Sequence, residues 1–343
     1  MTEAAANHGE LAVVIPTLGR DTLVPTVDSV LRAEGADKIE IIVAGHLDDQ
    51  ATAAALQERL AANPNLQHLD VSFPAGDSSE KKNAGWHATQ AEIVAFIDDD
   101  VIVAPDWILN LLAGFKDNDV ALVSGPGLVP PDARWFARLA GLALSSPAAG
   151  YVAWRYRPGE GDAIPIKWSK IIGCNMAYRR SAIEQLGGFD PKFWPGEEMI
   201  AAYKTEQSGH AVHFLPTAWV YHYPRHTVSR YIRQIYGYGA TRVRLIRAGV
   251  DREVATLAPG ALVAALLIGF PLALTVAPLR LPWIALIALY AVIVAFIAVR
   301  MALESGKLKD LGLLVVIPIM HISYGIGEWV ELLRPNRDLS VRK

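Results

Sequence analysis

The sequence predicts an α/β domain with a doubly wound, mostly parallel β-sheet, followed by an α-helical transmembrane region. Between residues 11 and 225, short apolar runs typical of buried strands alternate with segments typical of helices. Between residues 254 and 334, long apolar runs without charge follow one another. The hydrophobic fraction is 52% and the mean hydropathy is +0.24, and the apolar excess is concentrated in these C-terminal runs.

The N-terminal part shows the alternation most clearly. Strands are expected at Leu11–Ile15, Ile39–Val43, Leu66–Val71 and Ile93–Ile97, and helices at Asp21–Ala33, at Gln50–Leu60 and from Glu80 onward. Alternating strands and helices are typical of a parallel sheet, because a parallel connection needs a crossover helix.

Three carboxylates, Asp98, Asp99 and Asp100, directly follow the apolar run Ile93–Ile97. Ligands of open α/β sheets bind at the carboxyl ends of the strands, where this cluster is expected. Residues two apart in extended chain point the same way, so Asp98 and Asp100 form a pair suited to Mg²⁺ or Mn²⁺ carried with a diphosphate. The alternative is a solvated acidic turn.

A second polar cluster starts the helix that leads into this strand. Lys82 and Asn83 lie near the helix N-terminus, where side chains and backbone N–H groups can bind a diphosphate. The alternative is an ordinary exposed lysine on a helix.

Several motifs occur together in one order. They are Val14-Ile-Pro-Thr17, Lys82-Asn83-x-Gly85, Phe96-Ile-Asp-Asp-Asp-Val101 with Pro105-x-Trp107, Gly173-Cys-Asn-Met-Ala-Tyr-Arg-Arg180, Gly187-Gly-Phe-Asp190 and Gly196-Glu-Glu198. This set resembles the family 2 glycosyltransferases, which have the GT-A fold, from Leu11 to His226. The resemblance implies a hexosyltransferase that uses a nucleotide-diphosphate sugar and inverts the anomeric centre.

The resemblance also implies which residues bind the donor. Asp98 would contact the ribose, and Pro16, Thr17, Lys82, Asn83 and Asp99 would complete the nucleotide-sugar site. Asp99 would face away from the metal or support it. Asp100 would bind the metal, and Asp98 and His222 are its further candidate ligands. A histidine in the position of His222 is a metal ligand in some family members, and packing is the alternative.

The acidic pair Glu197 and Glu198 would carry the catalysis. Glu198 is our candidate general base, because the acceptor hydroxyl must lose its proton as it attacks the sugar. Family pairs commonly end in Asp, so which glutamate is the base stays open. An acid-rich helix start is the alternative reading of both residues.

Two departures from the family pattern bear on specificity. The acid that usually follows the second strand and pairs with the nucleobase is absent or displaced to Asp48, so the nucleobase is undecided. The Gln-x-x-Arg-Trp motif of processive members is also missing, which predicts one sugar per visit.

Three long apolar runs near the C-terminus predict transmembrane helices; the first two carry no charge, and the third carries none between Leu311 and Gly327. They cover about 254–279, 281–299 and 311–330, and spanning a bilayer takes about 17–25 apolar residues. The third run is alternatively buried or re-entrant. We expect a flexible N-terminus at 1–10, the glycosyltransferase domain at 11–225, a basic interfacial helical segment at 226–253, transmembrane helices within 254–334 and a basic tail at 335–343.

Several classes of function are disfavoured. The net charge of −3 gives no sign of a nucleic-acid partner, and the single cysteine excludes an intramolecular disulfide framework and a zinc site built from several cysteines. The polar first ten residues do not form a signal peptide. We therefore expect a multi-pass protein of the cytoplasmic membrane, in contact with its lipids, with the catalytic domain facing the cytoplasm.

The acceptor follows from a weaker resemblance. The segments Arg233–Gly239 and His321–Gly327, with the apolar runs, resemble the membrane-anchored branch that includes the succinoglycan enzyme ExoA. That branch implies a polyprenyl-diphosphate-linked saccharide acceptor in exopolysaccharide or cell-envelope glycan assembly. One alternative is transfer to polyprenyl phosphate, as in dolichyl-phosphate-mannose synthases. A non-catalytic nucleotide-binding membrane scaffold is another.

Overall fold

The structure, a computed structural model, describes residues 9–73, 78–250 and 254–334. The basic tail expected at 335–343 and nearly all of the flexible N-terminus expected at 1–10 lie outside this range. The chain forms two compact units, which are described separately. Unit 1 comprises residues 1–130 and 154–223, and unit 2 comprises 131–153 and 224–343.

Unit 1 is built on an eight-stranded sheet with the order β3-β2-β1-β4-β9-β6-β10-β8. The strands are β1 (Leu11–Pro16), β2 (Glu40–Ala44), β3 (Leu66–Leu69), β4 (Ile93–Ile97), β6 (Val120–Ser124), β8 (Ile164–Pro165), β9 (Asn175–Arg179) and β10 (Ala211–Phe214). Within this sheet β8 and β9 run against the other strands. The predicted mostly parallel sheet is therefore confirmed.

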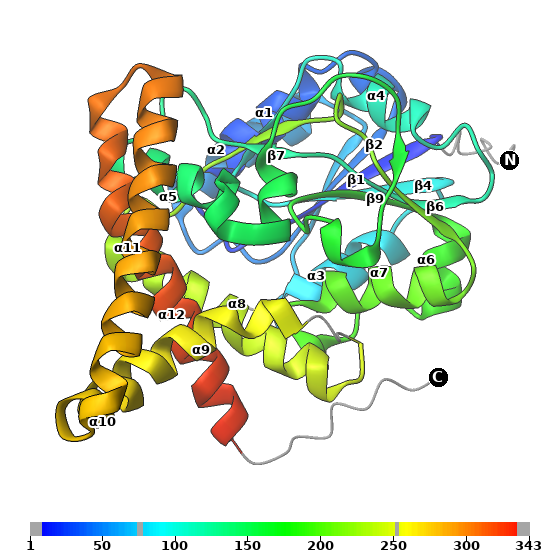
Figure 1. The fold of residues 1–343 in the computed structure, drawn as a ribbon. Helices are drawn as coiled ribbons and strands as arrows, with labels where there is room; N and C mark the ends of the chain where they lie inside the picture. Colours follow the sequence, from blue (N-terminus) through cyan, green and yellow to red (C-terminus); the bar gives the residue numbers. More distant parts are fainter. Residues whose placement is uncertain (1–8, 74–77, 251–253, 335–343) are drawn as a thin grey trace, which may run out of the picture. The chain divides into compact units, whose positions relative to one another are not determined.

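Helices flank the sheet (Figure 1). They are α1 (Leu23–Leu31), α2 (Gln50–Ala62), α3 (Ser78–His87), α4 (Trp107–Ala113), α6 (Arg180–Leu186) and α7 (Glu197–Gln207), with short 3₁₀ helices at Ala36–Lys38, Trp168–Lys170 and Pro191–Phe193. Both faces of the central strand β4 are covered, which explains its uninterrupted apolar sequence. Ala95 belongs to the core that contains Val27 and Trp107. Phe96 faces the other way and packs edge-on against Tyr178 and Phe189.

A small second sheet extends β4 beyond the acidic cluster. It contains β5 (Val101–Val103), β11 (Val220–His222) and β7 (Gly127–Leu128) in the order β5-β11-β7. The antiparallel pairing of β5 with β11 sets His222 opposite Val101, the residue after Asp100. Two segments far apart in sequence therefore meet at the end of β4.

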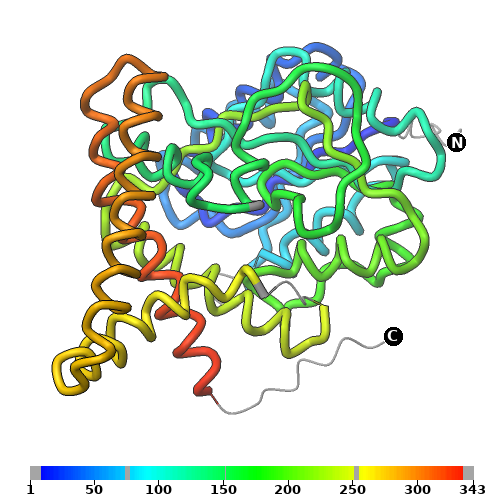
Figure 2. The backbone as a smooth tube through the Cα atoms, in the orientation of Figure 1, coloured from blue at the N-terminus to red at the C-terminus, as the bar shows by residue number. Residues whose placement is uncertain are grey.

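Unit 2 is helical within the described residues. Its helices are α5 (Trp135–Ser145), α8 (Val228–Arg247), α9 (Ala258–Ala264), α10 (Phe270–Thr275), α11 (Ala277–Ser305) and α12 (Leu313–Leu333), with a π-helical turn at Ala265–Gly269 and 3₁₀ turns at Val254–Leu257 and Leu308–Gly312. Buried Asp310 before α12 binds Arg138 of α5 at 2.6 Å. Figure 2 shows the long path of the chain through α11 and α12.

Glycines let α8 and α12 pack backbone against backbone. A Cβ atom added at Gly239 of α8 would lie 2.0 Å from the carbonyl oxygen of Tyr324, and one added at Gly327 of α12 would lie 2.1 Å from that of Tyr236. Such close contacts are typical of small-residue packing between membrane helices.

Three helical stretches among the described residues are long and apolar enough to cross a membrane. They are Ala255–Thr275, Ala277–Ser305 and Leu308–Leu333, with mean hydropathies of 2.2, 2.6 and 1.6. The third stretch is 44% buried in its most apolar part, against 17% for each of the other two, because α12 packs on α8 and α9.

Candidate active site

The three aspartates at the end of β4 point in alternating directions. Asp99 is turned toward the segment after β1, where its Oδ2 atom accepts hydrogen bonds from Thr17 Oγ1 at 2.8 Å and from the backbone N–H of Leu18 at 3.0 Å. The guanidinium of Arg20 donates to Asp99 Oδ1 at 3.2 Å. Both oxygens of Asp99 therefore accept hydrogen bonds from residues 17–20, and the carboxylate holds the loop after β1 in place.

Asp100 points toward the small sheet. Its Oδ1 atom lies 3.2 Å from Nε2 of His222, and its Oδ2 atom lies 3.4 Å from Nη1 of Arg20. The backbone carbonyl of Asp100 also accepts a hydrogen bond from the N–H of Tyr223 at 3.2 Å. The β5–β11 register thus brings the predicted ligand His222 to the predicted ligand Asp100.

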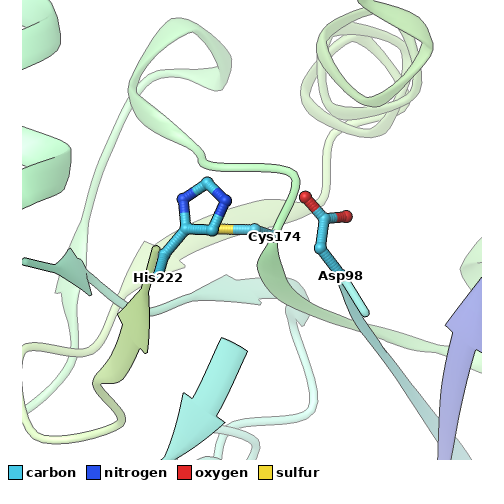
Figure 3. A group of neighbouring side chains, drawn as sticks. All are labelled: Asp98, Cys174 and His222. Carbon is cyan, nitrogen blue, oxygen red and sulfur yellow. The ribbon is translucent and has the colours of Figure 1, made fainter. Parts of the chain in front are cut away.

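Asp98 lies near a cysteine that adjoins the neighbouring strand β9. The last residue pair of the antiparallel β4–β9 ladder is Ile97 with Asn175, so Asp98 and Cys174 are each one residue beyond it. Ligand atoms of Asp98, Cys174 and His222 all lie within 4.8 Å of one another. Figure 3 shows these three side chains, which come from three different segments. We call Asp98, Asp100, Cys174 and His222 the ligand cluster.

The electrostatics of the ligand cluster favour a positive charge in it. Burial, together with the negative charge of Asp100, raises the pKa of Asp98 above its usual value. Burial by itself lowers the pKa of His222, but the nearby Cys174 and Asp100 outweigh it and hold that pKa well above its usual value. Burial raises the pKa of the Cys174 thiol. Either a proton on His222 or a metal ion can supply the charge.

Both carboxylate oxygens of Glu197, the first residue of α7, accept hydrogen bonds. Its Oε1 atom accepts hydrogen bonds from Ser78 at 2.7 Å and from the ammonium of Lys82 at 2.9 Å. Burial opposes ionisation of Glu197, but Lys82 outweighs it, so the pKa of Glu197 lies below its usual value. Glu197 therefore remains ionised as part of a buried ion pair.

Glu198, the next residue, is half-buried and lies beside the ligand cluster. A Cβ atom added at Gly173, the residue before Cys174, would lie 3.1 Å from Cγ and 3.3 Å from Cδ of Glu198. Burial, with the charge of Glu197, raises the pKa of Glu198 to about 7. The Glu198 carboxyl group can therefore take up a proton near neutral pH, as a general base must.

The comparisons with known proteins identify the family. The profile "Glycosyl transferase family 2" matches residues 12–187, which is just over half of the chain. The chain belongs to glycosyl transferase family 2. This result confirms the family predicted from the ordered motifs, and with it an enzyme of the glycosyltransferase class with the GT-A fold.

Three relatives illustrate the range of this glycosyltransferase's similarity. The "Pre-mycofactocin glycosyltransferase" of Mycobacterium tuberculosis is 26% identical over 74% of this chain, which spans only 51% of that relative's length. The "O-antigen chain rhamnosyltransferase RfbN" of Salmonella typhimurium is 26% identical over 65% of this chain and 70% of its own. The "Succinoglycan biosynthesis protein ExoM" of Rhizobium meliloti is 26% identical over 54% of this chain and 56% of its own length.

A solved structure supports the fold. The mannosyltransferase PcManGT from Pyrobaculum calidifontis, solved in complex with GDP-Man and Mn²⁺, superposes with a TM-score of 0.58. The match covers 95% of this chain and 88% of the other, at 20% sequence identity. At that identity the likeness concerns the fold of the glycosyltransferase and not its substrates.

The remaining predicted donor residues of the glycosyltransferase contact other protein groups. The ammonium of Lys82 is paired with Glu197, and the amide of Asn83 exchanges two hydrogen bonds with the backbone of Phe189, each at 2.8 Å. Pro16 ends β1, and the carbonyl of Thr17 accepts a hydrogen bond from Lys81 at 2.7 Å. A donor contact for these four residues stays a prediction.

Sequence reasoning missed three residues of this glycosyltransferase's site. Cys174 is in the ligand cluster, Arg20 binds Asp99 and Asp100, and Asn175 fixes the segment that carries Cys174. The signal for Arg20 was its place just after β1, because parallel neighbours such as β1 and β4 end at the same edge of the sheet. Cys174 could be found only from the β4–β9 register.

Proposed function

We propose that this glycosyltransferase is metal-dependent and inverting. It transfers one sugar from a nucleotide-diphosphate sugar to a hydroxyl of a lipid-linked saccharide. The observation that carries the proposal is the position of Glu198, a carboxyl group with a pKa of about 7 that lies against Gly173, next to the ligand cluster. The candidate base Glu198 thus packs against the residue that precedes Cys174 of the candidate metal site.

The donor end of the proposed site is the ligand cluster. Two carboxylates and an imidazole that converge from separate segments are a donor set suited to Mn²⁺ or Mg²⁺, and the crowded acids explain why a cation is favoured. The ion would stabilise the charge that develops on the departing nucleoside diphosphate. In support, the superposed PcManGT structure was solved with GDP-Man and Mn²⁺.

The acceptor end of the proposed site is Glu198. Its carboxylate accepts the proton of the acceptor hydroxyl while the hydroxyl oxygen attacks the anomeric carbon from the face opposite the diphosphate. The new bond to the acceptor oxygen forms as the bond to the diphosphate oxygen breaks, so the anomeric configuration inverts. Lys82, paired with Glu197 and close to Glu198 and Asp98, holds these carboxylates together.

Two observations support a lipid-linked acceptor. The described residues include three helices long and apolar enough to cross a membrane, so the enzyme is expected at the membrane where such acceptors reside. Two relatives carry names from glycan assembly, "O-antigen chain" and "Succinoglycan biosynthesis". We place the enzyme in the cytoplasmic membrane with the catalytic unit on the cytoplasmic side.

The test compares two acceptors in a Glu198→Gln variant of the full chain. Glutamine keeps the size of the side chain but cannot take a proton, so transfer to a hydroxyl acceptor should fall about 10²–10⁴-fold. Release of nucleoside diphosphate is measured with Mn²⁺ and a membrane lipid extract, and then with a polyprenyl phosphate. The exposed Glu58→Gln variant is the control.

The outcomes separate the proposed reaction from its main alternative. A phosphate acceptor is already ionised and needs no base. If Glu198→Gln retains near-normal turnover with polyprenyl phosphate and the wild-type enzyme does not use the extract, the acceptor is polyprenyl phosphate and our proposal is wrong. Wild-type turnover that a chelator leaves unchanged would contradict the metal dependence.

A further inference from the structure

We propose that Cys174 is a metal ligand and makes this site prefer thiophilic divalent ions such as Zn²⁺ and Co²⁺ over Mg²⁺. The inference rests on the proposed function in that it assigns the ligand cluster to a metal ion. It goes beyond that function because it assigns the choice of ion to a residue for which the family resemblance predicts no role.

The fold fixes Cys174 at the centre of the ligand cluster. Cys174 is 4% exposed, and a Cβ atom added at Gly127 of β7 would lie 3.4 Å from its Sγ atom and 3.7 Å from Cβ of His222. A glycine at position 127 thus leaves room for the cysteine and the histidine to lie next to each other. Asn175 holds the adjoining backbone through hydrogen bonds to the carbonyls of Ala218 and Pro126.

The spacing of the ligand atoms fits one ion. Bonds from zinc to sulfur, nitrogen and oxygen are about 2.0–2.3 Å long, so two ligands of one ion lie at most about 4.6 Å apart. The ligand atoms of Asp98, Cys174 and His222 lie within 4.8 Å of one another, and Asp100 lies 3.2 Å from His222. Small side-chain rotations therefore suffice to bring these groups onto one ion.

The chemistry of the donor set decides which ion is preferred. When an ion binds, the S–H bond of Cys174 would break as a sulfur–metal bond forms, a protonated His222 would give up one ring proton, and both protons would be released to the solvent. Thiolate and imidazole ligands select zinc-like ions, whereas Mg²⁺ requires hard oxygen ligands in near-ideal octahedral geometry. Cys174 therefore disfavours Mg²⁺ relative to Zn²⁺ and Co²⁺, and Mn²⁺ is intermediate because it accepts carboxylates.

The test measures the absorption spectrum of Co²⁺ bound to the protein. The chain contains one cysteine, so a thiolate-to-cobalt charge-transfer band in the near ultraviolet can come only from Cys174. The full chain is purified in detergent without its affinity tag, kept reduced, freed of metal and titrated with Co²⁺ alone. We expect the band in the wild-type protein and in the exposed Glu58→Gln control, and its loss in Cys174→Ser.

Competition between ions gives a second readout. Displacement of Co²⁺ by Zn²⁺ and by Mg²⁺ yields their relative affinities, and Cys174→Ser should reduce the preference for Zn²⁺ over Mg²⁺ at least about tenfold. Wild-type protein that binds Co²⁺ without the band, or does not bind Co²⁺, would overturn the inference whether or not the variant folds.

The failure of this inference can be told apart from the failure of the proposed function. If the band is absent but Asp100→Asn abolishes metal-dependent sugar transfer, the metal-dependent reaction stands and Cys174 is not a ligand. If the band is present but transfer is indifferent to metal, Cys174 is a ligand and the metal-dependent reaction is wrong.

Discussion

Adjacent glutamates at the start of α7 have opposite electrostatic environments. Glu197 is paired with Lys82 and its pKa lies below the usual value, whereas burial and the charge of Glu197 raise the pKa of Glu198 to about 7. Carboxyl groups with separated pKa values commonly divide the roles of proton transfer and charge stabilisation. The environment favours Glu198 as the base, a choice that the sequence motif alone left open.

The rate of transfer should follow the ionisation of Glu198. A base acts only when deprotonated, so kcat/KM should rise about tenfold per pH unit below about 7 and level off above it. The measurement is the pH profile of nucleoside diphosphate release at saturating Mn²⁺. A profile that is flat down to about pH 5, close to where an ordinary glutamate titrates, would contradict this assignment.

The buried Lys82–Glu197 pair should be costly to break from one side. Both side chains are less than 5% exposed, so Lys82→Met should destabilise the fold by about 3–5 kcal/mol because it leaves the Glu197 charge unpaired.

Adding Glu197→Gln to Lys82→Met should restore part of that stability, as measured by chemical denaturation in detergent. The control is Glu184→Gln, which removes the exposed carboxylate of an i,i+4 helical pair with Arg180 and should cost about 0.5 kcal/mol. A double variant that is as unstable as the sum of the two single variants would show that the charges are independent.

At the scale of elements, strand register assembles the site. Each ligand residue adjoins or ends a short strand: Asp98 follows β4, Cys174 precedes β9 and His222 ends β11. Sequence patterns predicted β4 and its acidic end, because an apolar run followed by carboxylates is a local signal. They did not predict the contact of Asp98 with Cys174, because antiparallel pairing between strands far apart in sequence leaves no local signal.

Asn175 should be essential to this assembly. It is fully buried, its side-chain Nδ2 donates to the carbonyl of Ala218 at 2.7 Å, and its side-chain Oδ1 accepts from the indole N–H of Trp107 at 3.0 Å. Asn175→Ala leaves those buried groups unpaired, at about 1–3 kcal/mol for each.

The loss should appear as a lower Tm than that of the wild-type protein and as weaker Co²⁺ binding. The control is Asn63→Ala, since Asn63 is only partly buried and bonds one carbonyl of its own helix. Equal Tm values for Asn175→Ala and Asn63→Ala would contradict a positioning role for Asn175.

At the scale of the whole chain, the two units are packed differently: unit 1 around an apolar sheet, and unit 2 through close contacts between helices. Unit 1 has a sheet with apolar strands, and the sequence predicted it because strand and helix periodicities are local. Unit 2 packs α8 against α12 through glycine contacts. The apolar runs predicted these helices, but not which faces meet, because residues such as Gly239 and Gly327 have no side chain to mark a face.

Two glycines of α8 offer a matched pair to test that packing. Gly239→Ala places a Cβ atom 2.0 Å from the carbonyl of Tyr324 and should destabilise the protein by about 1–3 kcal/mol. Nothing lies within 4 Å of a Cβ added at Gly237, so Gly237→Ala should be neutral or stabilising by about 0.5–1 kcal/mol. Tm is measured in detergent, and equal shifts for the two variants would contradict the packing.

The order of the ligand residues along the chain has a consequence for biosynthesis. Positions 98, 174 and 222 adjoin or end strands that pair only after long stretches of polypeptide have been made. A nascent chain that ends before His222 lacks the complete set, and domains generally fold from the N-terminus during synthesis. Capture of the proposed ion is therefore expected late in translation, when the ribosome has finished unit 1 and turns to the three apolar helices.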